Sequence, residues 1–380
     1  AISYLTKRRA SPAEGKLETL LGSILLGMTS AWQDPASLGL AHLLSARTLF
    51  KEWYTGPCNS SPPSSTSFMV GIMAYWEALA SFLTTEGPET LEYLTAFSDQ
   101  ELRNDVIYPN PWTGISTTLF IYTAQVGSLC RQNRVMRALS PSIASSAALD
   151  EIYLKQFYEA IELERKTLQY SPPNPDRIED PSDRLTTIHH FQCLAQMYRF
   201  TVLLQLYITF PGLLRKDDRG GSLHQASSLR QSAQEVPGEE IIALAVGILN
   251  LVSSLPESSG TRVLSTLPLI IAGSCLQNAW RVARKQGNTS NTLHSVIVDE
   301  VLSLHSSELM LSHWRSFVRQ KLKSLHELIG LDPILRAIQI LEAVWLRADL
   351  SASANNDTSE VPFVHWMDVM AEERLESIFG

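Results

Sequence analysis

Apolar residues recur three and four positions apart along almost the whole chain, and the alternating runs typical of strands are few. This period places apolar side chains on one face of a helix. We predict helices over 16–29, 35–53, 67–83, 115–139, 147–169, 182–210, 239–255, 262–286, 292–303, 307–329, 333–348 and 361–379. The pattern therefore predicts an all-α protein, a large multi-helix array or bundle of about twelve or more helices in one lobed domain.

Four segments rich in Pro, Gly, Ser, Asn and charged residues interrupt this pattern, at 56–66, 171–181, 211–238 and 351–360. Such composition favours turns, so we predict mobile loops there. No change of composition divides the chain, and no repeat of about 30 to 45 residues is present. We therefore expect a single domain over 1–380.

The composition of the chain argues against two classes of binding partner, nucleic acid and membranes. Hydrophobic residues make up 44% of the chain and charged residues 18%, so much of each helix must face other helices. A net charge of −8 argues against extended contact with phosphate groups, and no apolar run has the length and purity of a membrane span. We expect neither direct binding of nucleic acid nor membrane insertion.

Residue patterns with known chemistry are absent from the sequence: there is no nucleophile elbow, zinc-protease helix, phosphate loop or dinucleotide fingerprint. The four cysteines lie far apart, which makes a reducing compartment the default. His189 and Cys193 lie one helical turn apart and are a possible metal pair, but no third or fourth ligand stands near them in the sequence. We favour a satisfied histidine and a core cysteine, and predict no catalytic residues, no metal and no enzyme activity.

A polar stripe on helix 182–210 is the stronger candidate for a site. His189, Gln192, Gln196 and Arg199 share one face, and the helix becomes apolar all round just after them. Arg199 therefore enters the interior, where a guanidinium must meet an acid, carbonyls or a ligand. A structural carboxylate is the favoured partner, and lining of a small-molecule pocket is the alternative.

A second polar stripe follows the apolar start of helix 262–286. Its members are Ser274, Asn278 and Arg281, with Trp280 beside them. If the two stripes face each other, they form an apolar chamber with a few donors, which suits a metabolite carrying a carboxylate or phenol. These eight residues are the predicted ligand-binding set, and simple exposure of both stripes to solvent is the alternative.

Ten local sequences carry a resemblance to a known family, and they cover nearly the whole chain in order. They are AHLLSARTLF (41–50), YWEAL (75–79), NPWTGIS (110–116), SLCRQ (128–132), FYEAIELERKTLQ (157–169), MYRFTVLLQLYITF (197–210), TLPLIIAGSC (266–275), FVRQKLKSL (317–325), ILRAIQILEAVWLRAD (334–349) and WMDVMAEERLESIF (366–379). Together they resemble the fungal-specific transcription factor domain, the regulatory region that follows a six-cysteine binuclear zinc cluster in fungal regulators.

This resemblance implies an effector-response domain of a nuclear transcription factor that controls a metabolic or secondary-metabolite gene set. It implies a small-molecule effector, the transcriptional machinery and a homodimer as partners. The chain has no counterpart of the zinc cluster, so zinc and DNA contacts are expected only in a region that it does not contain. The family offers no shared effector residues to transfer. A helical enzyme or small-molecule carrier, and a protein-interaction scaffold, are the alternatives.

Overall fold

The computed structural model of the chain describes residues 16–55, 63–98, 105–139, 147–214, 238–277, 307–354 and 362–379. Within these ranges the regular secondary structure is helical, and β-structure is limited to two isolated bridges, Ile107 with Ile178 and Asn110 with Gly114. The prediction of an all-α, multi-helix fold is confirmed. None of the helices in these ranges combines the length and hydropathy that crossing a membrane requires.

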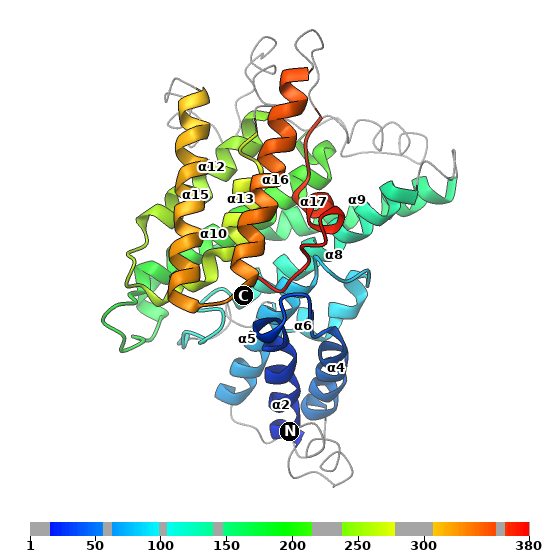
Figure 1. Cartoon of the computed structure of the whole chain (residues 1–380). Coiled ribbons are helices and arrows are strands. Elements are labelled where there is room, and N and C mark those ends of the chain that lie inside the picture. Colours follow the sequence, from blue (N-terminus) through cyan, green and yellow to red (C-terminus); the bar gives the residue numbers. More distant parts are fainter. Residues whose placement is uncertain are drawn as a thin grey trace.

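The N-terminal helices form a lobe at one end of the molecule (Figure 1). They are α2 (Lys16–Met28), the short α3 (Ser30–Gln33), α4 (Leu40–Tyr54) and α5 (Pro63–Ala80). At Gly39, which precedes α4, φ is +62°, and a Cβ atom there would lie 2.2 Å from the carbonyl oxygen of Gly27. A glycine is therefore required where the two helices α2 and α4 approach each other.

The body of the molecule contains the remaining long helices. They are α8 (Thr117–Leu139), α9 (Ala147–Gln169), α10 (Ile188–Thr209), α12 (Gly238–Ser254), α13 (Thr266–Ser274), α15 (Ser307–Ile329), α16 (Pro333–Ala354) and α17 (Trp366–Glu372), with short turns η3 (Pro175–Arg177), η4 (Pro211–Leu214) and η6 (Gly260–Ser265). The short turn η1 (Pro88–Leu91) and the short helix α6 (Glu92–Thr95) follow α5, and α6 lies beside α4 (Figure 1).

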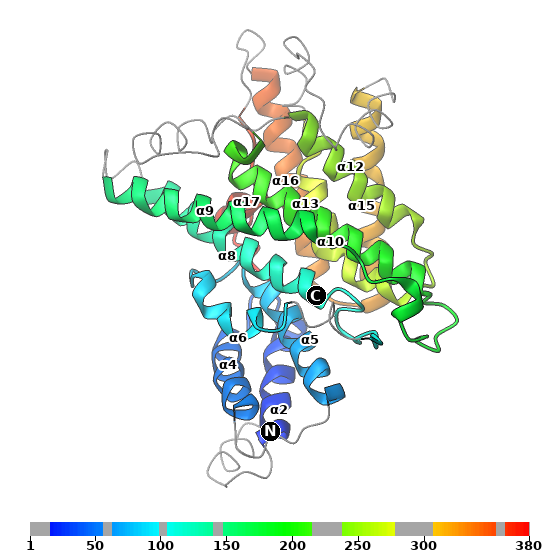
Figure 2. The ribbon, with the colours of Figure 1, turned by 180° about the vertical axis from the view of Figure 1, so that it is seen from behind.

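The apolar part of α10 lies at the centre of this body. Helix α10 packs against α8, α12 and α13, and its path across the body is clearest from behind (Figure 2). Every residue of α13 is buried. Helices α15 and α16 run side by side, and both pack against α13 (Figure 1). One hydrophobic cluster extends from Leu20 in α2 to Phe379 near the C-terminus, so the lobe and the body share a core.

The predicted helix over 361–379 is much shorter in the structure. Helix α17 ends at Glu372, and Arg374 adopts a φ of +56°. Beyond it the chain continues without helix, Ile378 and Phe379 are buried, and the Ser377 hydroxyl donates to the Pro35 carbonyl at 2.7 Å. Burial of these two side chains against the body outweighs the local helical period. The helical extent predicted for this segment is therefore wrong.

The predicted loops are only partly loops. Helix α5 already begins at Pro63, and α16 continues to Ala354, so the edges of the predicted loops 56–66 and 351–360 are helical. Segment 171–181 is a connection with one short turn, η3. The rest of 56–66 and 351–360, most of 211–238 and the predicted helix 292–303 lie outside the described residues. Mobility of these loops and a single domain over 1–380 stay predictions.

Candidate functional site

The predicted stripe on α10 lies along the outer side of that helix. His189 is exposed, and Gln192, Gln196 and Arg199 are half-buried. The Cys193 thiol is 3.5 Å from Nε2 of His189, and burial raises the pKa of the thiol. Within the described ranges, no group of three or more His, Cys, Asp and Glu side chains is arranged to hold a metal ion.

Arg199 binds the end of α9 and not a carboxylate. Its Nε donates to the Thr167 carbonyl at 3.0 Å, and Nη2 donates to the Leu168 carbonyl at 2.7 Å. Carbonyls in the last turn of a helix lack intrahelical partners and form the negative end of its dipole. The favoured carboxylate partner is therefore wrong, and carbonyls take its place. Burial lowers the pKa of the guanidinium.

The second predicted stripe is described only at Ser274, which is fully buried at the end of α13. Its hydroxyl donates to the Ile271 carbonyl of the same helix at 2.8 Å. Asn278, Trp280 and Arg281 lie outside the described residues. Ser274 thus points into its own helix while the α10 stripe lies at the surface, and the assignment of all eight residues to a ligand site stays a prediction.

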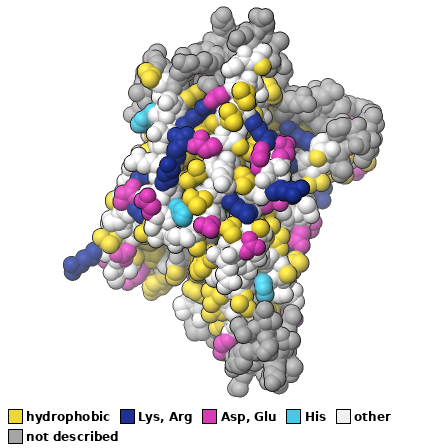
Figure 3. All heavy atoms as spheres, in the orientation of Figure 1, with side chains coloured by type: hydrophobic (Ala, Val, Ile, Leu, Met, Phe, Trp, Pro, Cys, Tyr) yellow, Lys and Arg dark blue, Asp and Glu magenta, His cyan; other side chains and the backbone are white. Residues whose placement is uncertain are grey.

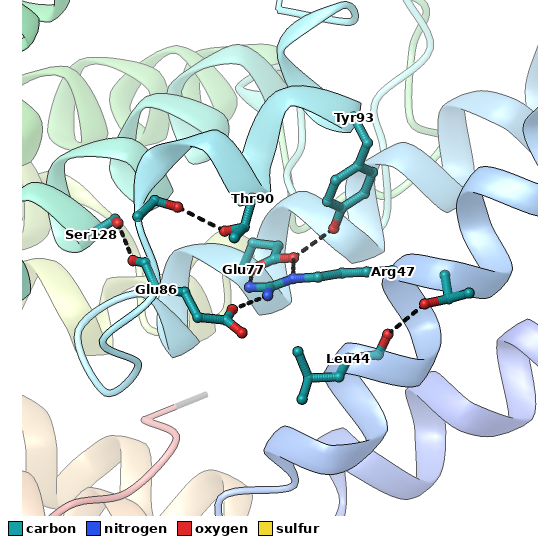
Figure 4. Close-up of polar contacts among 9 residues, drawn as sticks. Leu44, Arg47, Glu77, Glu86, Thr90, Tyr93 and Ser128 are labelled. Atoms are coloured by element: carbon teal, nitrogen blue, oxygen red, sulfur yellow. Dashed lines mark hydrogen bonds and ion pairs between the residues drawn. The ribbon is translucent and has the colours of Figure 1, made fainter.

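A buried ion cluster joins α4 to α5, and sequence analysis did not predict it (Figure 4). Arg47 donates to both carboxylate oxygens of Glu77, with N–O distances of 2.6 and 2.7 Å, and also pairs with Glu86. The Tyr93 hydroxyl donates to the same Glu77 carboxylate at 2.6 Å. Glu77 is 0% exposed. Because each charge is paired, this cluster is a structural connection between α4, α5 and the segment 86–93 that follows α5.

The pKa directions in this cluster follow from its geometry. Burial alone lowers the pKa of Arg47, but the hydrogen bonds to Glu77 and Glu86 outweigh burial and raise it above its usual value. Burial, followed by the charge of Glu77, raises the pKa of Tyr93. Arg47 therefore remains charged and Tyr93 remains a neutral donor at physiological pH.

A surface groove of about 460 Å³ lies between α16 and the segment that leads into α17. We name it the clasp groove and define it by its lining residues, which are Arg347, Leu350, Ser351, Phe363, Val364, His365, Asp368, Val369 and Glu372. It falls within the usual size range of small-molecule sites, roughly 300–1,000 Å³.

The buried amide of Gln277, just after α13, holds one wall of the clasp groove. Its Nε2 donates to the Val364 carbonyl at 2.7 Å, and the Val364 N–H donates to Oε1 at 3.1 Å. The same Nε2 donates to the Ser274 carbonyl at 2.6 Å. Ser274, the first residue of the second predicted stripe, is therefore connected to the clasp groove through its backbone.

Charged residues from two helices hold α17, which lies beside both α8 and α16 (Figure 1). Arg134 of α8 pairs with Asp368, and Arg347 of α16 pairs with Glu372 and Glu373. On the face of the molecule that carries α16, basic, acidic and apolar side chains are interleaved (Figure 3).

His365 begins α17 as its cap. Nδ1 of the ring accepts the Met367 N–H at 3.2 Å. Burial, with the charges of Arg134 and Arg137 added, lowers the pKa of His365 well below its usual value. The imidazole is therefore neutral, and because Nδ1 is an acceptor, the ring proton is on Nε2.

The whole chain, residues 1–380, matches the profile of the fungal specific transcription factor domain. The chain belongs to this family. Family membership assigns the domain a role in transcription regulation, with the nuclear location and transcriptional partners that this role generally implies. No curated protein and no solved structure shows a significant match to the chain.

Two of the local sequences that carried the resemblance meet in the ion cluster of this transcription factor domain. Arg47 stands within AHLLSARTLF, and Glu77 stands within YWEAL. Both residues stood in these motifs with no role predicted for them, although a charge inside an apolar helix was a visible signal. Their pairing was missed because the helical period of each segment says nothing about which distant helix lies opposite.

Proposed function

We propose that this chain is the ligand-responsive regulatory domain of a fungal transcription factor that controls a metabolic or secondary-metabolite gene set. In the full-length protein, a zinc cluster outside this chain binds DNA, and this domain dimerises and alters contact with the transcriptional machinery when an effector binds. The chain itself contributes no catalysis and needs no cofactor.

The clasp groove is the observation that supports an effector. Its lining combines four apolar side chains, Leu350, Phe363, Val364 and Val369, with five polar or charged ones. The charged members Arg347, Asp368 and Glu372 are engaged in ion pairs, which leaves apolar surface beside a small number of oriented polar groups. Its wall is attached to α13 through Gln277, and α17 on its other side is attached to α8 through Asp368. A bound molecule would therefore contact two segments of the chain, 347–351 and 363–372, and the second of these is attached to α8 and to the end of α13.

Thermal-shift screening of metabolites against the purified domain tests this proposal. An effector raises the melting temperature in a concentration-dependent way, because it binds the folded state only. Leu350→Arg should abolish the rise, since Leu350 lines the groove. Leu346→Arg is the matched control: Leu346 is one turn earlier on α16, equally exposed at 61%, and not part of the lining.

The same assay separates the clasp groove from the predicted α10 stripe. Gln192→Leu and Gln196→Leu should leave the ligand-dependent rise unchanged if the groove is the site. A rise that survives Leu350→Arg but is lost in the two glutamine variants would move the site to the stripe. Absence of any stabilising metabolite would contradict the effector proposal and favour the interaction-scaffold alternative over an enzyme or carrier.

A further inference from the structure

The cations around the clasp groove are already occupied. Arg347, which lines it, is paired with Glu372 and Glu373, and Arg134 behind it is paired with Asp368. Among the described lining residues, no guanidinium or ammonium group is left for an anionic ligand. A carboxylate placed here would have to compete with Glu372 and Glu373 for Arg347, which both of them already engage.

A cationic ligand is disfavoured for a different reason. The fields of Arg134 and Arg137 already oppose a positive charge on His365, whose ring lines the groove. A ligand ammonium next to this ring would meet the same repulsion. A ligand ammonium would also have to compete with Arg134 and Arg347 for the carboxylates of Asp368 and Glu372, which these arginines already engage.

The groove nevertheless offers one oriented donor and apolar walls. With Nδ1 held by the Met367 N–H, the remaining ring nitrogen of His365 carries the proton and donates. Leu350, Phe363 and Val364 supply partly exposed apolar surface beside this ring. A hydrogen-bond acceptor attached to an apolar body is complementary to this arrangement.

We propose that the clasp groove binds an uncharged, apolar molecule with a carbonyl-type acceptor. The acceptor receives a hydrogen bond from the Nε2–H group of His365, and the apolar body contacts Leu350 and Phe363. This assignment rests on the proposed function, because it specifies the ligand class of the same site. It differs from the carboxylate-bearing metabolite expected for a chamber between the two polar stripes.

A matched set of probes tests the charge preference. Acetylnaphthalene, naphthoate and (naphthylmethyl)ammonium share one ring system and are respectively neutral, anionic and cationic at neutral pH. Titration by ligand-observed NMR should give a dissociation constant for acetylnaphthalene that is at least about 10-fold lower than for either charged probe. Leu350→Arg should abolish binding of acetylnaphthalene, and Leu346→Arg should retain it.

A comparison of two neutral probes, one with and one without a hydrogen-bond acceptor, tests whether His365 donates to the ligand. Ethylnaphthalene lacks the acceptor and should bind the native domain several-fold more weakly than acetylnaphthalene. His365→Asp keeps an oxygen acceptor to cap α17 but removes the N–H donor. In this variant, the two neutral probes should bind equally. Retention of the full preference for the ketone in a folded His365→Asp domain would exclude His365 as the donor.

The outcomes also separate this inference from the proposed function. Tighter binding of naphthoate or the ammonium probe that is lost in Leu350→Arg overturns the charge class but keeps the groove as a ligand site. Binding that is insensitive to Leu350→Arg overturns the location. No binding by any probe overturns the ligand class, and the metabolite screen then decides on the proposed function separately.

Discussion

Replacement of Arg47 by methionine removes the guanidinium that neutralises Glu77. The Glu77 carboxylate is 0% exposed and would keep, among the described residues, the hydrogen bond from Tyr93. Removing one partner of a buried ion pair costs about 3–5 kcal/mol. Glu86 reaches solvent with 35% of its side chain exposed, so we expect the lower half of this range, about 3–4 kcal/mol.

The expected loss is large enough to measure in two ways. With an unfolding entropy of roughly 2 cal/mol/K per residue, a chain of 380 residues should lose about 4–5 °C in melting temperature. Urea unfolding followed by circular dichroism gives the free energy directly. A buried pair is poorly screened, so the loss should change little between low and high salt.

Two further variants test whether the loss comes from an unpaired, buried Glu77 charge. Glu77→Gln combined with Arg47→Met removes the unpaired charge while the amide oxygen still accepts from Tyr93, so the double variant should be more stable than Arg47→Met alone. Arg165→Met breaks the exposed pair with Glu162 and should cause no measurable change. A loss below about 1 kcal/mol for Arg47→Met, or strictly additive effects, would refute a buried, coupled cluster.

Two further predictions follow from the described contacts, and a third follows from the net charge. Arg199→Ala should destabilise the domain by about 1–2 kcal/mol in urea unfolding, because two carbonyls at the end of α9 lose a half-buried cation; an unchanged midpoint would contradict this. The pKa of His365 is lower in the folded than in the unfolded chain, so stability should fall as pH drops below about 6.5, by at most ~1.4 kcal/mol per unit, and His365→Asn should reduce this slope. A domain of net charge −8 should not bind duplex DNA at physiological salt, and a salt-sensitive mobility shift would disprove this.

Local patterning predicted some helices with the bounds that the structure has. Helices α9 and α15 begin and end where the apolar period and the flanking loop residues indicate. The helical period predicted the wrong helix bounds where packing against distant residues opposes the local pattern. At the C-terminus, Arg374 leaves the helical region so that Ile378 and Phe379 reach the core. The sequence showed that four polar residues share one face of α10, but it did not show the carbonyl partners of Arg199.

The chain by itself determined the fold class and the family, because helical periodicity is a local property and the ordered motifs extend over the whole length. Only the tertiary structure decided which polar groups meet. Arg47 and Glu77 are 30 positions apart, and Gln277 and Val364 are 87 apart, yet each pair makes direct hydrogen bonds. The period of a helix specifies which side is apolar and leaves open which distant helix covers it. The ion cluster and the clasp groove are both made at such contacts, where the packing of separate helices sets the partner of each side chain.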